Sequence, residues 1–471
     1  MRKNLTSFIS LIVILGFACM AYAGNEATVR FPQTNAGKLA ESYFSAFNSH
    51  NENDMRTYLE QNFAPNTLKE RPIEERMAVY RQLKSDLATL EPVKILKEST
   101  DAIKLVARSA KEAWLELTFE FEKNAPYKLL GIRIMRLEEA PDLSAPTSLM
   151  TETEMLKELN TFMDGISVKD EFSGVVLVAK GQKPIFRKAY GLASKEYNVP
   201  NRVDTRFNLG SISKFLTRIA IEQLQGKGKL SLDDPIGKYL PDYPNKEAAE
   251  NVTIRHLLEM TSGIGDFFGE KYQSTPKDRI RTLSDYLLLF GDEPLLFEPG
   301  TNHRYSNGGY IVLGLIIEKV SGQTYFDYVR DHIYNIAEME NTTHLEADVP
   351  TQNVASGYTN NWDGNDHPGE PKRNNIYTRP ARGSSAGGGY SSVDDLLKLI
   401  IALRENKLSA PRTSEEISQQ RIGIAGGAPG INAIVETDPE TNYTIIVLSN
   451  YDPPAAQKIA RKINSFLERL K

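Results

Sequence analysis

The sequence predicts an α+β protein with two domains, of which the first sets helices against a curved antiparallel sheet. The second is predicted to combine an antiparallel sheet flanked by helices with a mainly helical lobe. Helical patterns precede alternating strand patterns in residues 30–139, whereas strand patterns lie near both ends of residues 151–471. Residues 140–150 between them are rich in Pro and Ser, as linkers are. A chain of 471 residues also exceeds one typical domain.

The chain begins with the pattern of a secretory signal peptide, which we expect to span residues 1–23. Arg2 and Lys3 precede an apolar run at residues 8–20, and small residues follow at the −3 and −1 positions of a cleavage site after Ala23. A membrane anchor needs about 20 clean apolar residues, and this run is shorter. We therefore expect a soluble mature protein in the periplasm or secreted from the cell.

Cysteine content and charge narrow the class of protein further. Cys19 is the only cysteine and lies within the segment expected to be removed, so the mature protein would have no disulfide or thiolate. Export without disulfides favours a bacterial over a eukaryotic extracellular protein. A net charge of −5 gives no electrostatic case for binding nucleic acid or an anionic membrane.

The first domain, residues 30–139, has a helices-then-strands order. Amphipathic helices are expected at residues 39–47, 55–59 and 73–90, and half-buried antiparallel strands at residues 93–96, 103–107, 114–121 and 129–137. The order resembles the cone-shaped domains of the nuclear transport factor 2 type. No His, Asp or Glu residues cluster here with catalytic spacing, so we expect an accessory module, with homodimer formation as a candidate role.

The second domain, residues 151–471, has strands at both of its ends. Strands are expected at residues 172–179, 184–189, 432–435 and 444–448, and flanking helices at residues 151–163 and 455–470. The middle of the domain reads as helices and loops. This order predicts one sheet closed by the two ends of the domain, with an inserted helical lobe.

The candidate catalytic centre begins where a short extended run ends at Gly210 and an apolar helix follows, closing at Gly226. Ser211 lies at the start of this helix and Lys214 about one turn later, so the two side chains share a face. A serine hydroxyl becomes a good nucleophile when a neighbouring base takes its proton. A lysine is a useful base only if burial lowers its pKa from about 10.4. The helix N-terminus would favour a developing oxyanion.

Ser-x-x-Lys is a weak motif by itself, because an ordinary N-cap serine and a surface lysine would give the same letters. Ser274 and Lys277 match it as well, and Pro276 there indicates a capped helix start. The assignment of Ser211 and Lys214 therefore depends on the surrounding chain.

A second motif, Tyr305-x-Asn307, lies between a Pro-Gly turn and a buried helix at residues 310–322. A tyrosine held in such a loop can relay a proton, and an asparagine can orient a substrate amide. Tyr358-x-Asn360 also matches but has neither the turn nor the helix, so we discount it.

Together, these motifs and the strand–helix–strand layout resemble the serine β-lactamase and penicillin-binding protein superfamily, with the class C β-lactamase-like group as the nearest branch. That group includes D-alanyl-D-alanine carboxypeptidases and esterases. The resemblance covers roughly residues 155–471, and further similar segments are residues 230–236, 253–258, 261–263 and 386–392. It implies a β-lactamase-like fold for the second domain.

The resemblance also implies acyl transfer through an acyl-enzyme on Ser211, with Lys214 and Tyr305 sharing the base and acid roles. Asn307 would position the substrate, and the backbone N–H groups of Ser211 and Gly427 would hold the oxyanion. No cofactor and no metal are expected. The six histidines are scattered without a ligand spacing, and we expect His256 to be structural and His303 to be exposed near Tyr305.

One position departs from the pattern of that superfamily. Its third motif has Lys or His first, a small residue second and Gly third, and here the matching residues are Ile424, Ala425 and Gly426, followed by Gly427. In lactamases and peptidases the basic residue binds the substrate carboxylate. Ile424 therefore disfavours β-lactam hydrolysis and D-Ala-D-Ala cleavage, whereas Gly426 and Gly427 still suit substrate binding through the backbone.

Three functions stay open at this point. The favoured one is an exported serine hydrolase that cleaves a small-molecule or peptide-like ester or amide. The second is a D-alanyl-D-alanine carboxypeptidase or β-lactamase acting on peptidoglycan-like substrates. The third is a catalytically silent binding protein on the same fold, which the joint presence of Ser211, Lys214, Tyr305 and Asn307 argues against.

Overall fold

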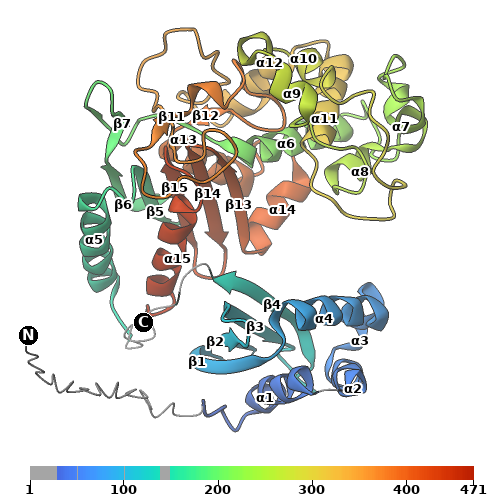
Figure 1. Ribbon diagram of the computed structural model, residues 1–471, viewed down its shortest axis with the longest axis vertical. Coiled ribbons are helices and arrows are strands. Elements are labelled where there is room, and N and C mark those ends of the chain that lie inside the picture. Colours follow the sequence, from blue (N-terminus) through green and yellow to red (C-terminus); the bar gives the residue numbers. More distant parts are fainter. Residues whose placement is uncertain (1–28, 50, 100, 138–139, 141–148, 471) are drawn as a thin grey trace, which may run out of the picture. The chain divides into compact units, whose positions relative to one another are not determined.

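The computed structural model describes residues 29–49, 51–99, 101–137, 140 and 149–470. The chain divides into two compact units, residues 1–148 and 149–471, and each combines helices with an antiparallel sheet (Figure 1). The predicted α+β class is thereby confirmed. The expected signal peptide and most of the expected linker lie outside the described residues. Within those described ranges, no helix combines the length and apolar character needed to cross a membrane.

The N-terminal unit has helices first and then a four-stranded antiparallel meander in the order β1-β2-β3-β4 (Figure 1). Its elements are α1 (Asn35–Asn48), α2 (Glu52–Asn62), α3 (Pro65–Glu70), α4 (Ile73–Leu87), β1 (Leu90–Glu98), β2 (Ala102–Ser109), β3 (Trp114–Phe121) and β4 (Leu129–Leu137). The likeness to the nuclear transport factor 2 type stays a prediction.

The core of this unit forms between α1 and the sheet. Thr34 caps α1 by accepting a hydrogen bond from the Gly37 amide, and the helix then buries a run of aromatic side chains. The rings of Tyr43 and Phe119 meet edge to face with centroids 5.3 Å apart. Because alternate residues of β3 point inward, one face of the strand is apolar as the sequence predicted.

The helix expected at residues 73–90 ends earlier, at Leu87. Ala88 has a φ of 63°, which breaks the helix, and Leu90 already belongs to β1. The side chain of Asn48 holds Leu90 by donating to its carbonyl (2.7 Å) and accepting from its amide (2.8 Å). This contact from α1 starts the sheet where periodicity alone still favoured helix.

The C-terminal unit is built on a five-stranded antiparallel sheet in the order β13-β14-β15-β5-β6. The strands are β5 (Gly174–Lys180), β6 (Lys183–Tyr190), β13 (Ile422–Ala428), β14 (Ile431–Asp438) and β15 (Tyr443–Ser449). Pairing of β15 with β5 joins the two ends of the unit, as predicted. β13 is an edge strand and contacts the 3-10 turn Gly210–Ile212, which precedes α6 (Ser213–Gly226).

Helices cover both faces of this sheet (Figure 1). Val176 and Val178 of β5 pack in a cluster with α5 (Glu152–Val168) and α15 (Ala455–Leu467), whereas Val175 and Leu177 belong to the larger cluster around α6. A strand buried on both faces reads as a continuous apolar run, which is what residues 174–179 show.

The rest of the unit consists of further helices, one of which contacts the sheet, and of short strands. The helices are α7 (Lys246–Asn251), α8 (Ile254–Leu258), α9 (Glu270–Ser274), α10 (Leu283–Leu287), α11 (Asn307–Ser321), α12 (Tyr325–Val329), α13 (Val393–Arg404) and α14 (Pro411–Gln419). The strands are β7 (Leu192–Ser194), β8 (Val199–Pro200), β9 (Phe207–Asn208), β10 (Tyr358–Thr359), β11 (Arg373–Asn374) and β12 (Tyr390–Ser391).

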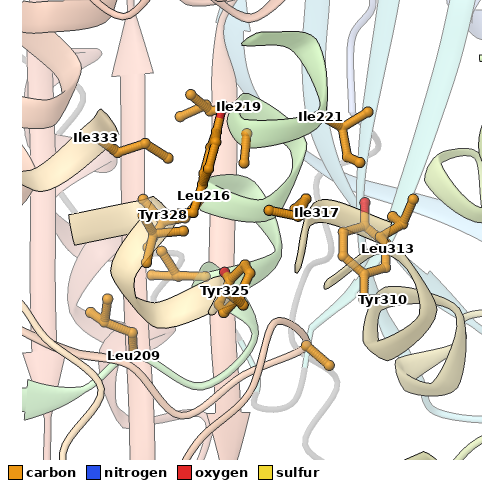
Figure 2. Packing of buried hydrophobic residues seen from close by; sticks show 14 of the residues in the cluster. Leu209, Leu216, Ile219, Ile221, Tyr310, Leu313, Ile317, Tyr325, Tyr328 and Ile333 are labelled. Carbon is orange, nitrogen blue, oxygen red and sulfur yellow. The ribbon is translucent and has the colours of Figure 1, made fainter. Parts of the chain in front are cut away.

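α6 lies at the centre of the unit, and Figure 2 shows its side chains in one cluster with those of α11 and α12. The sequence predicted one buried face, but polar positions of α6 are buried as well, including Ser213 and Thr217. Thr217 Oγ1 lies 2.8 Å from the Tyr325 hydroxyl and donates to the Ser385 carbonyl (2.7 Å). A helix buried on most sides holds its first turn rigidly.

Candidate active site

Ser211 lies in a single 3-10 turn, Gly210–Ile212, directly before α6. Gly210 has a φ of 51°, a left-handed conformation that glycine adopts without strain. The side chain of Asn208 accepts a hydrogen bond from the Gly210 amide (2.9 Å), and Leu209 donates to the Gly389 carbonyl (2.7 Å). The backbone that leads into Ser211 is thus fixed by two hydrogen bonds.

Lys214 is 6% exposed, and its Nζ atom lies 3.2 Å from Ser211 Oγ. Nζ also lies 2.6 Å from Asn307 Oδ1 and 2.6 Å from the Ala386 carbonyl oxygen. Burial lowers the pKa of Lys214 to about 7, and the negative charge of Asp266 opposes that shift. An amine with this pKa is partly unprotonated at neutral pH, so it can accept a proton.

Tyr305 donates a hydrogen bond from its hydroxyl to Ser211 Oγ over 2.7 Å. Its ring is 51% exposed, which places it at the mouth of the site. Desolvation raises the pKa of Tyr305, and the hydrogen bond to Ser211 opposes this. The phenol therefore stays protonated at neutral pH. Lys214 Nζ lies 4.7 Å from the Tyr305 ring centroid, within the range of cation–π attraction.

Asn307 is the first residue of α11, and Ser306 caps the helix by accepting from the Gly309 amide (2.8 Å). Ser306 Oγ also donates to the Gly265 carbonyl (2.9 Å), which ties α11 to the preceding loop. The next residue of that loop, Asp266, accepts a hydrogen bond from Asn307 Nδ2 over 2.6 Å. Sequence reasoning missed Asp266, whose only signal was its place three residues after the Thr-Ser-Gly segment 261–263.

Gly426 and Gly427 of β13 lie against the Ser211 turn. A Cβ atom on Gly426 would lie 1.9 Å from the Leu209 carbonyl oxygen and 2.8 Å from the Ser211 nitrogen. A Cβ atom on Gly210 would lie 2.9 Å from the Gly427 nitrogen. The backbone nitrogens of Ser211 and Gly427 therefore meet at one junction, where two N–H groups can stabilise an oxyanion.

Ile424 lies two residues before Gly426 and on the same face of β13. Its side chain is partly buried and packs against the large hydrophobic cluster of the unit. An apolar side chain thus occupies the strand position at which the third motif of the superfamily has Lys or His.

The two competing motif matches take part in other contacts. The helix start predicted at Ser274 is wrong. Ser274 is instead the last residue of α9, where its hydroxyl donates to the Glu270 carbonyl (3.0 Å). The reason is that Pro276 separates α9 from a 3-10 turn that begins at Lys277. The Tyr358 hydroxyl is bonded to Glu196.

The histidines singled out above lie apart from the Ser211 cluster of contacts. His256 accepts from the Thr253 amide at Nδ1 (3.3 Å) in a capping box at the start of α8, so it stabilises that helix. His303 is exposed. Within the described ranges, no three His, Cys, Asp or Glu side chains gather as a metal site would require.

The Beta-lactamase family profile matches residues 159–468 of the chain. The chain belongs to the beta-lactamase family. It is therefore a serine hydrolase of that fold, and the predicted resemblance is confirmed for the C-terminal unit.

Individual relatives have different names. A penicillin-binding protein of Bacillus subtilis (strain 168) is 35% identical over 188 residues, which are 40% of this chain and 41% of that protein. Esterase EstB of Burkholderia gladioli is 29% identical over 285 residues, which are 54% of this chain and 72% of the esterase. The crystal structure of a penicillin-binding protein from Bacillus halodurans superposes with a TM-score of 0.57 at 31% identity, covering 65% of this chain and 98% of that one.

Proposed function

We propose that the protein hydrolyses a neutral ester or amide through an acyl-enzyme on Ser211. The observation that carries the proposal is that Lys214 and Tyr305 both reach the Oγ atom of Ser211, at 3.2 and 2.7 Å. The pKa of Lys214 is lowered to about 7, and the pKa of Tyr305 is raised. A base and an acid thus act on one nucleophile.

The hydrogen bonds of Lys214 suit the role of base. A neutral amine has two hydrogens and one lone pair. The Asn307 Oδ1 and Ala386 carbonyl oxygens, both 2.6 Å from Nζ, can accept the two hydrogens. The lone pair is then left for the hydroxyl proton of Ser211.

Acylation follows from this arrangement. Ser211 Oγ forms a bond to the substrate carbonyl carbon while its proton passes to Lys214 Nζ. The carbonyl oxygen takes up negative charge, which the N–H groups of Ser211 and Gly427 stabilise. When the tetrahedral intermediate collapses, the bond to the leaving group breaks. Tyr305 donates its proton to that group, and the Lys214 ammonium gives up the proton taken from Ser211 to the resulting phenolate, so both groups return to their starting states.

Deacylation repeats the sequence with water as the nucleophile. Water gives a proton to the Tyr305 and Lys214 pair and attacks the acyl carbon, and the ester bond to Ser211 Oγ breaks. The acid product leaves and Ser211 regains its proton, so no cofactor or co-reactant is consumed.

A neutral substrate is favoured by Ile424, because an apolar side chain gives a substrate carboxylate no charged partner. Two segments also carry exposed aromatic rings, Phe268 at 50% exposure, two residues after Asp266, and Tyr377 at 88% exposure. Tyr272, which packs on Phe268, donates to the Thr378 carbonyl (3.2 Å), so the two segments are connected. Apolar acyl or leaving groups would suit such rings.

Action on peptidoglycan-like peptides is the second candidate, favoured by the 35% identity to a penicillin-binding protein over 188 residues. Export through the segment at residues 1–23 would bring the protein to such substrates. Comparing cell fractions of the full chain and of a variant without these residues tests the export.

Steady-state kinetics on three substrate classes test the choice. We expect p-nitrophenyl esters of neutral acyl groups to give a kcat/KM at least tenfold above that for a D-Ala-D-Ala peptide or a cephalosporin. Ser211→Ala should abolish turnover, whereas Ser274→Ala, in the second Ser-x-x-Lys match, should leave it unchanged. A preference for the peptide would establish the second candidate instead.

A further inference from the structure

Asp266 connects to the base Lys214 through two short hydrogen bonds. Its Oδ2 atom accepts from Asn307 Nδ2 over 2.6 Å, and Asn307 Oδ1 lies 2.6 Å from Lys214 Nζ. We infer that Asp266 is a positioning residue, which holds the Asn307 amide in the one orientation that keeps Lys214 ready to act as a base. This inference rests on the function proposed for Ser211.

The argument begins with the two ends of the Asn307 amide. A side-chain amide has a donor end and an acceptor end, and they exchange places when the group rotates by half a turn. An ionised carboxylate can only accept, so Asp266 requires the Nδ2 end on its side. The Oδ1 end must then face Lys214.

The reversed amide would harm the base in either protonation state. Facing neutral Lys214, Asn307 Nδ2 would donate to the lone pair that must take the proton of Ser211. Facing the ammonium, it would set donor against donor. The carboxylate of Asp266 therefore acts on Ser211 through two residues, without touching the nucleophile.

Asp266 also contributes charge, and this effect is separable from orientation. The groups facing Lys214 are the rings of Tyr305 and Tyr310, with centroids 4.7 and 5.7 Å from Nζ, and the Asn307–Asp266 pair. Arg218, one turn along α6, is ion-paired with Glu222 and Glu416. The carboxylate of Asp266 is thus the negative charge that favours protonated Lys214.

The loop packing is consistent with a fixed Asp266. The Gly265 carbonyl accepts from Ser306 Oγ (2.9 Å), and Phe267 is buried with its ring centroid 4.9 Å from that of Tyr286. The residues on both sides of Asp266 are therefore held, so its carboxylate does not need to be ordered by substrate.

The test compares Asp266→Ala, Asp266→Asn, Asn307→Ala and the double variant Asp266→Ala/Asn307→Ala, on an ester substrate. Loss of orientation in Asp266→Ala should lower kcat roughly 10- to 100-fold with little change in KM. Asp266→Asn removes the charge from a group of the same shape, so it should move the acid limb of the kcat/KM profile to lower pH. Glu270→Ala, four residues further along the chain and exposed, is the charge-matched control and should behave as wild type.

The double variant separates a positioning role from an independent one. If Asp266 acts through Asn307, the double variant should be no slower than Asn307→Ala, because the partner is already gone. The inference would be overturned if the fall in kcat of the double variant equalled the product of the falls in the two single variants. It would also be overturned if both Asp266 variants kept the wild-type kcat and acid limb while Ser211→Ala was inactive. If Asp266→Ala fails to fold, kcat of Asp266→Asn alone and combined with Asn307→Ala decides in the same way, because an amide at position 266 no longer requires the Nδ2 end of Asn307 on its side. Full activity in Ser211→Ala would instead overturn the proposed function itself.

Discussion

The Nζ atom of Lys214 lies 3.2 Å from the Oγ atom of Ser211, although the chain places one residue in a 3-10 turn and the other in the helix that follows. Ser211 is partly exposed, whereas Lys214 is buried. That difference in burial gives the two groups complementary chemistry, since the buried amine gives up its proton near neutral pH. The predictions below follow from this relationship and from the contacts that maintain it.

Activity should depend on pH through Lys214. Its pKa is lowered to about 7 by burial, so below that pH the amine is protonated and cannot accept the Ser211 proton. We expect kcat/KM for an ester to rise with pH up to about 7 and to level off above it, and Lys214→Met to remove both the activity and this limb. A wild-type limb near pH 4 to 5 would point to a carboxylate base instead.

Gly426 should be essential for the oxyanion site. In Gly426→Ala the new Cβ would lie 1.9 Å from the Leu209 carbonyl oxygen, so β13 must move away from the Ser211 turn. Loss of a well-placed backbone donor should lower kcat about 10²- to 10³-fold. Gly423→Ala on the same strand is the control, because its Cβ would meet only Glu436 Cγ at 3.9 Å. Equal kcat values for the two variants would refute the assignment.

Replacing Ile424 should change substrate preference. Ile424→Lys would offer a substrate carboxylate a cation beside Gly426, and we expect the rate at which benzylpenicillin acylates Ser211 to rise at least tenfold. Ile422→Lys places the same charge two residues further from Gly426, on the same face of β13, and should have little effect. Intact-protein mass spectrometry over time measures both rates, and equal rates would show that charge at position 424 does not govern recognition.

Acid should destabilise the C-terminal unit through His344. This side chain is 4% exposed and packs against the rings of Tyr325, Phe326 and Tyr334. Burial and the charge of Arg382 lower its pKa to about 3. Between that value and the unfolded pKa of about 6.5 only the unfolded chain binds the proton, so stability falls as pH decreases through this window.

At pH 5 the free energy of unfolding should be lower by about 2 kcal/mol. This follows because pH 5 lies roughly 1.5 units below the unfolded pKa and each unit contributes about 1.36 kcal/mol. We expect the denaturant midpoint of His344→Gln to vary less between pH 7.5 and pH 5 than that of wild type. His303→Gln, at an exposed position, should keep the wild-type dependence. An equal change of the denaturant midpoint between the two pH values in all three proteins would exclude His344 as the cause of the acid destabilisation.

Much of this fold follows from local patterns. The runs at residues 174–179 and 445–448 are continuously apolar, which marks strands buried on both faces, and they pair as parts of β5 and β15. The spacing of Ser211 and Lys214 places both side chains on one helical face without any knowledge of the fold. A Pro-Gly turn and a buried helix likewise fixed the position of Tyr305 and Asn307.

The rest depends on contacts between distant parts of the chain. Asp266 is one acidic residue in a loop, and nothing in its neighbourhood shows that it will meet Asn307, 41 positions away. The Ala386 carbonyl that binds Lys214 is a backbone atom and has no sequence signal. Burial of the polar face of α6 depends on α12 and the Ser385 segment, which are brought to it by tertiary folding.

The most direct test of the central claim is intact-protein and peptide mass spectrometry after reaction with a fluorophosphonate probe and with a p-nitrophenyl ester. We expect one covalent adduct on wild type, located at Ser211, and none on Ser211→Ala, with Ser274→Ala labelled as fully as wild type. An unlabelled but folded wild-type protein, or an adduct that persists in Ser211→Ala, would contradict the assignment of Ser211 as the nucleophile.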